Sequence, residues 1–424
     1  MSNIKIERLK LSINKITYRL RIEIIYWLCQ QGIFFQHFIK LLSNKTYHIF
    51  KFTSINSIKS IILKRIQILS TQSNFVHYCA PLFSDYTFID TKNNENDFIL
   101  ETYVASIDSV KIIGGSNLIL IDNSYAIYEL KDIDKKKTTK FSDQGIRFYD
   151  DSKCMVSIDE TGVTFENGII LSGNFTWNYY HLLFEFIVKF EILNKTSIDK
   201  SIPILIDKIC IETSQYSQLI NIFNIDNRKI IPIEKGKMYS LKKGFHISCP
   251  NLIPPDILKP QLLKPDDLLF NLNSLKFLRE TLLPLKSDLV TPKRIFLSRS
   301  NASKRRKFNE SEVFELLKKY NFEMVFPENY SIIEQIAIFN NAEFIIGGSG
   351  AALTNVIFCN VNCKILVLVN SYIPFSGFST LADYVHAKMI YVTGDTIKVD
   401  KIKSLHESFI LNPKKIEQTL LNLL

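Results

Sequence analysis

The sequence predicts an α/β protein with a parallel, doubly wound sheet in its C-terminal part. From residue 289 onward, short apolar strands alternate with helical patterns, an order typical of such sheets. The segment IIGGSGAALTN, residues 345–355, reads as a strand, a tight turn and a helix. The chain has 424 residues, 46% of them hydrophobic, so we expect more than one buried core and two domains.

Residues 1–72 are predicted to form a basic, amphipathic helical arm. They hold twelve of the 52 Lys and Arg residues but only two of the 42 Asp and Glu residues, so the remaining chain is balanced. Apolar residues recur at helical spacing, namely Ile6, Leu9, Ile13, Ile16, Leu20, Ile24 and Trp27. Two interpretations stay open: a helix packed on its own domain, or a helix lying on an anionic membrane. No apolar run reaches the roughly 18 residues of a membrane span.

Residues 73–288 are predicted to form a first domain that begins with strands. The expected strands lie at residues 86–90, 110–122, 125–130 and 146–150. Asp132 and Asp134 lie in a charged loop among five lysines, and we expect no metal there because hard cations need converging oxygen ligands. Seven scattered cysteines without a CxxC pair indicate reduced thiols in a cytosolic setting.

The segment NYYHLLFEFIVKFEIL, residues 178–193, is predicted to be a helix. His181, Glu185 and Lys189 follow at steps of four and therefore lie on one stripe. One interpretation is a surface pair of Glu185 and Lys189 with an uninvolved histidine. The other is a carboxylate that orients an imidazole in a cleft.

Residues 289–424 are predicted to form a second, Rossmann-like domain. Strands are expected at 294–298, 323–326, 342–348, 364–369 and 389–393, and helices at 309–320, 331–342, 352–358 and 377–386. Asn309 is the expected N-cap of one helix, and Ser331 with Glu334 forms a capping box for the next. Ligands in such sheets bind at the carboxyl ends of the strands, where the glycine-rich turn lies.

A serine nucleophile is one chemistry that this turn could support. Ser349 lies between Gly347 and Ala351 as in a nucleophile elbow, and Asp383 and His406 follow in the chain order of a hydrolase. Against this, alanine replaces the last glycine, no HGGG-like segment exists, and Asp383 falls within a predicted helix.

A dinucleotide or a phosphate could also bind at the turn. Gly348 and Gly350 begin a dinucleotide pattern, but Leu353 stands where its third glycine belongs and Asn370 where a ribose-binding acid is expected. A phosphate needs only glycines and the amides of a helix N-terminus. Basic residues after the first strand of this domain favour a diphosphate, namely Arg299, Lys304, Arg305 and Arg306.

Three segments in order, NYYHLLFE, IFLSRSNASKRRKFNE and FPENYSIIEQIAIFNNAEFIIGGSGAALTN, resemble glycosyltransferase family 61, including its bacterial capsule- and polysaccharide-related members. The resemblance runs from about residue 110 to 395, and residues 1–72 fall outside it. It implies a GT-B-like fold, in which two Rossmann-type domains face a cleft, here with an N-terminal helical extension. It also implies inverting, metal-independent transfer from a nucleotide-sugar donor. Family members often have Gly-Pro-His-Gly where this chain has Gly347-Gly348-Ser349-Gly350, so no histidine side chain acts there.

The resemblance assigns roles to residues. It implies that His181, oriented by Glu185, deprotonates the acceptor. The donor-binding candidates are Arg299, Arg305, Gly348, Ser349, Gly350, Ala351 and Ala352, with Glu328 or Glu334 on the ribose and Gln335 of second rank. No cofactor and no metal ligand are expected.

The expected partners are the donor, a glycan or lipid-linked glycan acceptor of surface polysaccharide biosynthesis, and an anionic membrane reached through residues 1–72, with no nucleic acid. The expected location is cytoplasmic, with a peripheral position on the inner face of the membrane if the arm binds lipid. The rival functions are a serine hydrolase and a non-catalytic polysaccharide-binding scaffold.

Overall fold

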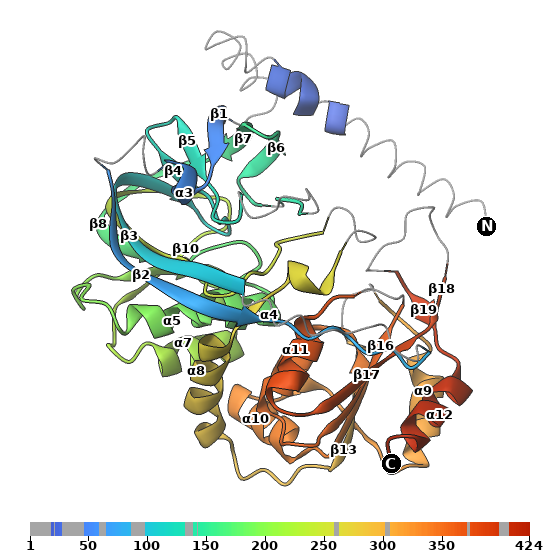
Figure 1. Cartoon of the computed structure of the whole chain (residues 1–424). Coiled ribbons are helices and arrows are strands. Elements are labelled where there is room, and N and C mark those ends of the chain that lie inside the picture. The colour runs from blue at the N-terminus through green and yellow to red at the C-terminus, as the bar shows by residue number, and fades with distance from the viewer. Residues whose placement is uncertain are drawn as a thin grey trace.

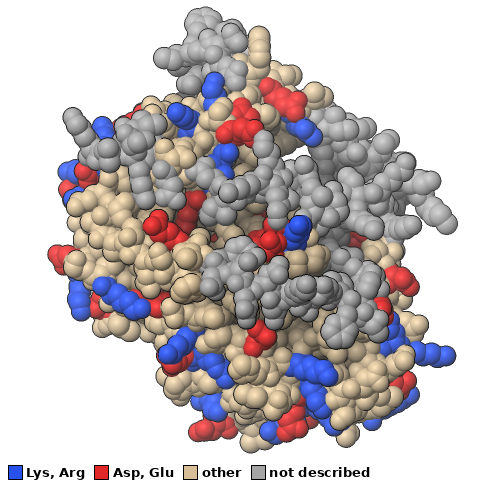
Figure 2. Space-filling model, viewed as in Figure 1, with Lys and Arg blue, Asp and Glu red and all other residues tan. Residues whose placement is uncertain are grey.

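The computed structural model describes residues 18–20, 22–27, 46–58, 65–85, 98–131, 139–141, 143–257, 263–301, 306–370, 374–397 and 407–424. These residues form a mixed α/β protein with a large sheet in the first half of the chain and a smaller parallel sheet in the second (Figure 1). Acidic and basic side chains are interspersed over the described surface of the face in Figure 2. That mixture agrees with the charge balance expected beyond residue 72.

The first sheet has twelve strands. They are β1 (Thr46–Thr53), β2 (Ile66–His77), β3 (Phe98–Ile113), β4 (Ile119–Ile121), β5 (Tyr125–Ile127), β6 (Ile146–Tyr149), β7 (Lys153–Ile158), β8 (Glu160–Ile170), β9 (Ile204–Asp207), β10 (Ile230–Ile233), β11 (Met238–Ile247) and β12 (Phe270–Asn271). Their order is β10-β9-β8-β11-β3-β4-β5-β1-β7-β6, with β2 paired to β3 and β12. The four neighbouring strands β10, β9, β8 and β11 are parallel to one another. In contrast, β3 pairs antiparallel with β11, β2 and β4. The prediction of a Rossmann-type sheet for this half is therefore wrong for most of its strands, because most of the other pairs are antiparallel.

Two expectations for the first half need correction. Residues 46–53 and 66–72 are not part of a helical arm, because β1 and the start of β2 lie there within the sheet. The pairing of β1 with β5 and β7, and of β2 with β3, supplies the backbone hydrogen bonds of these segments. The expected strand 110–122 is two strands, β3 and β4, joined by a turn at Gly115 with φ of +72°. The expected strand 86–90 lies outside the described residues.

The helices of the first half lie mainly between β8 and β13. They are α3 (Ile55–Ile58), α4 (Tyr179–His181), the π-helix η1 (Leu182–Ile187), α5 (Lys189–Leu193), α6 (Lys208–Glu212), α7 (Ser214–Phe223), η3 (Pro265–Asp267), α8 (Leu272–Leu282) and η4 (Leu283–Leu285). The predicted helix 178–193 is thus interrupted by a π-helical turn. The carbonyl of Phe184, within that turn, accepts a hydrogen bond from Asn251 Nδ2 at 2.7 Å. A side chain that supplies such a partner stabilises the wider turn.

The second half follows the predicted order of elements closely. It contains β13 (Arg294–Leu297), α9 (Glu310–Lys318), β14 (Glu323–Val325), η5 (Pro327–Asn329), α10 (Ile332–Asn341), β15 (Phe344–Gly348), the 3-10 helix η6 (Ala351–Phe358), β16 (Lys364–Val369), α11 (Gly377–Tyr384), β17 (Lys388–Thr393), β18 (Asp395–Thr396), β19 (Phe409–Ile410) and α12 (Pro413–Leu421). The sheet order β14-β13-β15-β16-β17 is parallel throughout. The strand order therefore reverses between β13 and β15, and such a switch point is where open sheets bind ligands.

The two halves share one buried core. A single apolar cluster contains Phe184 and Phe270 from the first half together with Leu297, Ile345 and Phe378 from the second. In addition, residues 78–85 leave β2 and run along the edge strand β17 (Figure 1). Ser84 donates its amide to the Tyr391 carbonyl at 2.9 Å, and Tyr391 donates to the Leu82 carbonyl at 2.8 Å. The shared core and this strap fix the first half against the second.

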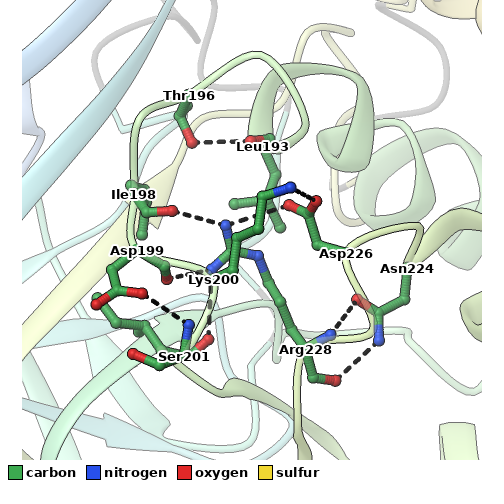
Figure 3. A network of polar contacts seen from close by, with 10 residues as sticks. Leu193, Thr196, Ile198, Asp199, Lys200, Ser201, Asn224, Asp226 and Arg228 are labelled. Atoms are coloured by element: carbon green, nitrogen blue, oxygen red, sulfur yellow. Dashed lines mark hydrogen bonds and ion pairs between the residues drawn. The ribbon is translucent and has the colours of Figure 1, made fainter.

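A polar network holds the loop that follows α5 (Figure 3). The guanidinium of Arg228 donates to the carbonyl of Ile198 at 2.8 Å and to that of Asp199 at 2.5 Å. Asp226 pairs with Lys200 at 2.7 Å on its exposed side. The buried guanidinium thus ties the loop at residues 198–199 to residue 228 through backbone carbonyls, while its Nε has no partner among the described residues.

The N-terminal part is described only at residues 18–20 and 22–27, both helical. Ile22 and Ile25 are buried against Tyr47 and Met155, and the Tyr26 hydroxyl donates to Asp150 at 2.7 Å. The large apolar side chains on the other side are exposed by more than half, namely Tyr18, Leu20, Ile24 and Trp27. Among the described residues, no helix combines the length and the apolar content that crossing a membrane requires.

Candidate functional site

A cleft of about 500 Å3 lies between the two halves of the chain. The first half lines it with residues that include Phe175, Trp177, Tyr180 and His181, and the second half with the turn 348–351 and Arg306. Its volume lies within the range of small-molecule sites. The predicted helix 178–193 and the predicted glycine turn thus open onto the same space.

His181 and Glu185 form a hydrogen-bonded pair at the edge of this cleft. His181 Nδ1 contacts the Glu185 carboxylate directly, and the Glu185 side chain is only 10% exposed. Asn178 caps the helix start by accepting the amide of Tyr180 at 3.0 Å, which fixes where His181 begins its turn. A carboxylate at Nδ1 holds the ring in one orientation and leaves Nε2 as the nitrogen that can accept a proton. The geometry matches the second interpretation of the sequence, because Glu185 pairs with His181 and Lys189 is buried.

Phe175 packs directly on the His181 ring. The two ring centroids are 4.9 Å apart with an interplanar angle of 27°, and the backbone of Phe175 has φ of +65°. A bulky residue in the left-handed region is strained, and such strain persists only where surrounding contacts impose it. Trp177, two residues on, is 53% exposed at the cleft. Trp177 packs against Phe175, and Tyr180 contacts the imidazole edge-on at 5.4 Å between centroids.

Asp207, at the end of β9, imposes that loop conformation. It accepts hydrogen bonds from the amides of Gly115 (2.6 Å) and Gly173 (3.0 Å) and from the hydroxyls of Ser172 (2.6 Å) and Thr176 (2.7 Å). Burial raises the pKa of Asp207 above its ordinary value although these hydrogen bonds oppose the shift. One buried carboxylate therefore holds residues 172–176, and through them Phe175.

Tyr180, which lines the cleft, carries an unsatisfied polar atom. Its hydroxyl is buried without a hydrogen-bond partner among the described residues, and Phe375 and Phe378 pack around its ring. A buried hydroxyl left unpaired costs free energy, so a partner supplied by a ligand would be favourable.

The glycines of the turn make room for Arg299. A Cβ at Gly350 would lie 1.9 Å from Arg299 Nη1, and one at Gly348 would lie 2.7 Å from Arg299 Cδ. Arg299 follows β13, and its Nε is buried without a partner among the described residues. Burial lowers the pKa of Arg299 against the opposing effect of Glu310. The turn therefore seats a guanidinium at the β13–β15 switch point.

The amides of the turn are only partly free. Ser349 donates its amide to the Leu368 carbonyl at 3.0 Å, so the expected amide cradle cannot include Ser349. The amides of Ala351 and Ala352 begin the helix η6 and have no partner within it. Arg306 Nη1 donates to the Ser349 carbonyl at 3.3 Å and also lines the cleft.

A family comparison decides what this cleft belongs to. Residues 179–366 match the family model described as Glycosyltransferase 61, just under half of the chain. Over this stretch the chain is a family 61 glycosyltransferase. No curated protein matches it. The match contains His181, Glu185, Arg299 and the glycine turn, and it begins just after the loop that carries Phe175.

Several candidates predicted for the glycosyltransferase do not reach the cleft. Glu334 is occupied as the capping partner of Ser331, whose amide it accepts at 2.8 Å, and neither Glu334 nor Glu328 lines the cleft. Arg305 lies outside the described residues. The helix at 310 begins after Asn309 as expected, but the Asn309 side chain binds Leu411 instead of capping.

The residues of the rival hydrolase can be followed only in part. Asp383 pairs with His77 at 3.0 Å, and His406 lies outside the described residues. Asp132 and Asp134 also lie outside them. Within the described ranges, no three His, Cys, Asp or Glu side chains converge in a way that could hold a metal ion.

Two residues that were not among the predicted site residues, Tyr179 and Asn355, connect the two halves of the glycosyltransferase, and Asn355 also binds the second-rank candidate Gln335. Tyr179 donates its hydroxyl to Asn355 Oδ1 at 2.7 Å, and Asn355 Nδ2 donates to Gln335 Oε1 at 2.8 Å. This chain joins the helix before His181 to η6, which follows the glycine turn. Tyr179, Asn355 and Gln335 all stood in the segments that resembled the family, but their pairing needed the fold.

Proposed function

We propose that this glycosyltransferase moves a sugar, with inversion and without a metal, from a nucleotide-sugar donor to a glycan or lipid-linked glycan acceptor. The observation that carries the proposal is that His181, whose Nδ1 contacts Glu185, lines the same cleft as the turn 348–351. A base and an anion site facing each other suit a direct displacement at the carbon between them.

The donor binds at the switch point of the second sheet. The free amides of Ala351 and Ala352 and the guanidinium groups of Arg299 and Arg306 stabilise the diphosphate as it leaves. They supply the positive charge that a divalent cation supplies in other transferases. Tyr180 offers its unpaired hydroxyl to the donor sugar.

The acceptor enters beside Phe175 and Trp177. Its hydroxyl proton passes to His181 Nε2 while its oxygen forms the new bond to the anomeric carbon and the bond to the diphosphate breaks. Glu185 stabilises the imidazolium that results. The nucleoside diphosphate then leaves, and the two halves correspond to the two domains of a GT-B arrangement whose first sheet has become mixed.

In this proposal the N-terminal segment, described at residues 18–20 and 22–27, binds an anionic membrane surface. The enzyme is cytoplasmic and belongs to surface polysaccharide biosynthesis, and membrane binding places it beside a lipid-linked acceptor. Ile22 and Ile25 attach the segment to the protein, while Leu20, Ile24 and Trp27 stay exposed. Those three belong to the apolar stripe expected from the sequence. Exposed apolar side chains beside many basic residues are typical of helices that lie on membranes.

Incubation with a panel of nucleotide sugars in EDTA tests the proposal. We expect one donor to release nucleoside diphosphate, and release to increase when a glycan acceptor is added. Ester hydrolysis that needs Ser349 would instead support the hydrolase. Polysaccharide binding without turnover of any donor would support the scaffold.

A further inference from the structure

A second, smaller cavity is lined by Glu185, the hydrogen-bond partner of His181. It has a volume of about 40 Å3, and four titratable side chains line it, namely Glu129, Glu185, Lys189 and His246. A polar cavity of this size has room for water. Glu185 thus contacts His181 and also lines this cavity.

Lys189 is the unusual member of this cluster. Its side chain follows Glu185 by four residues, the residue is 7% exposed, and its Nζ lies 5.5 Å from the centroid of the Phe186 ring. Among the residues that the structure describes, none forms a direct ion pair with it. A buried ammonium is costly unless other charges compensate it, so its neighbours across the cavity must do so.

Glu129 and His246 provide one charge between them. His246 Nε2 lies 3.7 Å from the Glu129 carboxylate, which also accepts the Cys249 amide at 2.7 Å. Burial tends to raise the pKa of Glu129, but His246, Lys189 and the Cys249 amide outweigh it and lower that pKa. Burial, with Lys189 assisting, lowers the pKa of His246 against the effect of Glu129. Near neutral pH, Glu129 is therefore ionised and His246 is neutral.

The other titratable groups around Glu185 are uncharged. Burial raises the pKa of three of them, Tyr128, Tyr180 and Cys249. The cavity is thus lined by two acidic side chains, Glu129 and Glu185, and by one basic side chain, Lys189. Protonation of the His181 ring would add a positive charge beside the acidic pair.

We propose that Lys189 and Glu129 are positioning residues which, acting across this cavity, set how readily the His181–Glu185 pair takes up the acceptor's proton. The inference rests on the proposed role of His181 as the base. Lys189 opposes uptake of the proton and Glu129 favours it, because each acts on the developing imidazolium by its charge. Their opposition keeps the base available at neutral pH.

Two neutral variants of nearly unchanged size test the sign of each effect. In Lys189→Met, the loss of a positive charge should move the acidic limb of the pH profile of kcat/KM upward by ~0.5–1 pH unit. In Glu129→Gln, the loss of a negative charge should move it downward by a similar amount. Lys189→Arg should restore the wild-type profile, and Lys195→Met, which removes an exposed lysine paired with Glu191, should leave it unchanged.

The titration of the His181 ring, followed by NMR in the protein without substrate, provides a second measurement. His181→Ala identifies the resonance, and the two variants should shift its midpoint in opposite directions. Shifts of the same sign, or no shift in a variant that folds, would overturn the proposal. Lys189→Gln serves if Lys189→Met does not fold. Opposite NMR shifts without any effect on transfer would uphold the coupling but contradict the role of His181 as base.

Discussion

The ring of Phe175 stacks on the imidazole of His181, with centroids 4.9 Å apart, and its backbone is held at φ of +65°. The contact joins a strained loop to the residue proposed as the base. It also explains why the loop is so heavily constrained by Asp207. The ring orientation of His181 is thus set from two sides, by Glu185 through a hydrogen bond and by Phe175 through packing.

Phe175→Gly should therefore lower kcat about tenfold with little change in the donor KM, because a loose imidazole spends less time aligned with the acceptor. Glycine adopts the positive φ without strain, so the fold should be retained or gain stability. Steady-state kinetics with varied donor and varied acceptor check this. The matched variant Trp177→Ala should raise the acceptor KM instead, and a stronger effect of Phe175→Gly on the donor KM would place Phe175 at the donor.

Gly350→Ala should weaken donor binding because its Cβ would lie 1.9 Å from Arg299 Nη1 and displace the guanidinium. Arg299→Met should have a similar effect, about tenfold or more in the donor Kd, since a charge-assisted hydrogen bond is lost. The double variant should lose little more than either single one, as expected when both remove the same interaction. Calorimetric titration of the donor checks this, with Ser349→Ala as the mild control. Fully additive losses would mean that the glycine serves the phosphate directly.

Nearly all of the second sheet could be predicted from the sequence, because each strand and helix from Arg294 to Thr393 has its own apolar pattern and ends in its own turn. The placement of His181 and Glu185 on one stripe of a helix could also be predicted. Contacts between segments far apart in the sequence could not. Three such contacts arise only when the chain has folded. They are the cavity lined by Glu129 and His246, the support of Phe175 by Asp207, and the hydrogen bond between Tyr179 and Asn355.

The errors in the first half have a physical cause as well. A strand such as β2, with mixed burial along its length, can carry spacings that also fit a helix. Because basic residues are spread over residues 1–72, the charge pattern does not indicate where the helical segment ends and the sheet begins. At the turn, no local pattern predicts that the Leu368 carbonyl accepts the Ser349 amide, because Leu368 lies in the neighbouring parallel strand.

Asp207→Asn should destabilise the protein by about 2 kcal/mol, because an amide cannot accept all four hydrogen bonds made by the carboxylate. Since burial raises the pKa of Asp207 above its ordinary value, the folded protein binds its proton more tightly than the unfolded chain. Its contribution is then largest at low pH and is lost as pH rises through the raised pKa. Urea unfolding at several pH values should show the wild-type advantage over Asp207→Asn shrinking as pH rises. A growing advantage would contradict this sign.

Replacement of the exposed apolar residues Leu20, Ile24 and Trp27 by serine should reduce binding to vesicles that contain anionic lipid. Binding should weaken in high salt without disappearing, because the apolar contribution is not screened. Cosedimentation with vesicles, read beside a thermal melt, checks this. The matched change, Ile22→Ser with Ile25→Ser, should mainly lower the melting temperature. Unchanged vesicle binding by the triple variant would leave this segment as structure alone.

The most direct test of the central claim follows the anomeric signals of donor and product by proton NMR during a reaction in EDTA, with wild-type protein and with His181→Ala. We predict a product of opposite anomeric configuration to the donor, formed without metal. We also predict a rate at least about a hundredfold lower for His181→Ala at saturating donor, because the proton transfer is lost. Retention of configuration, a requirement for a divalent cation, or an unimpaired His181→Ala variant would contradict the account.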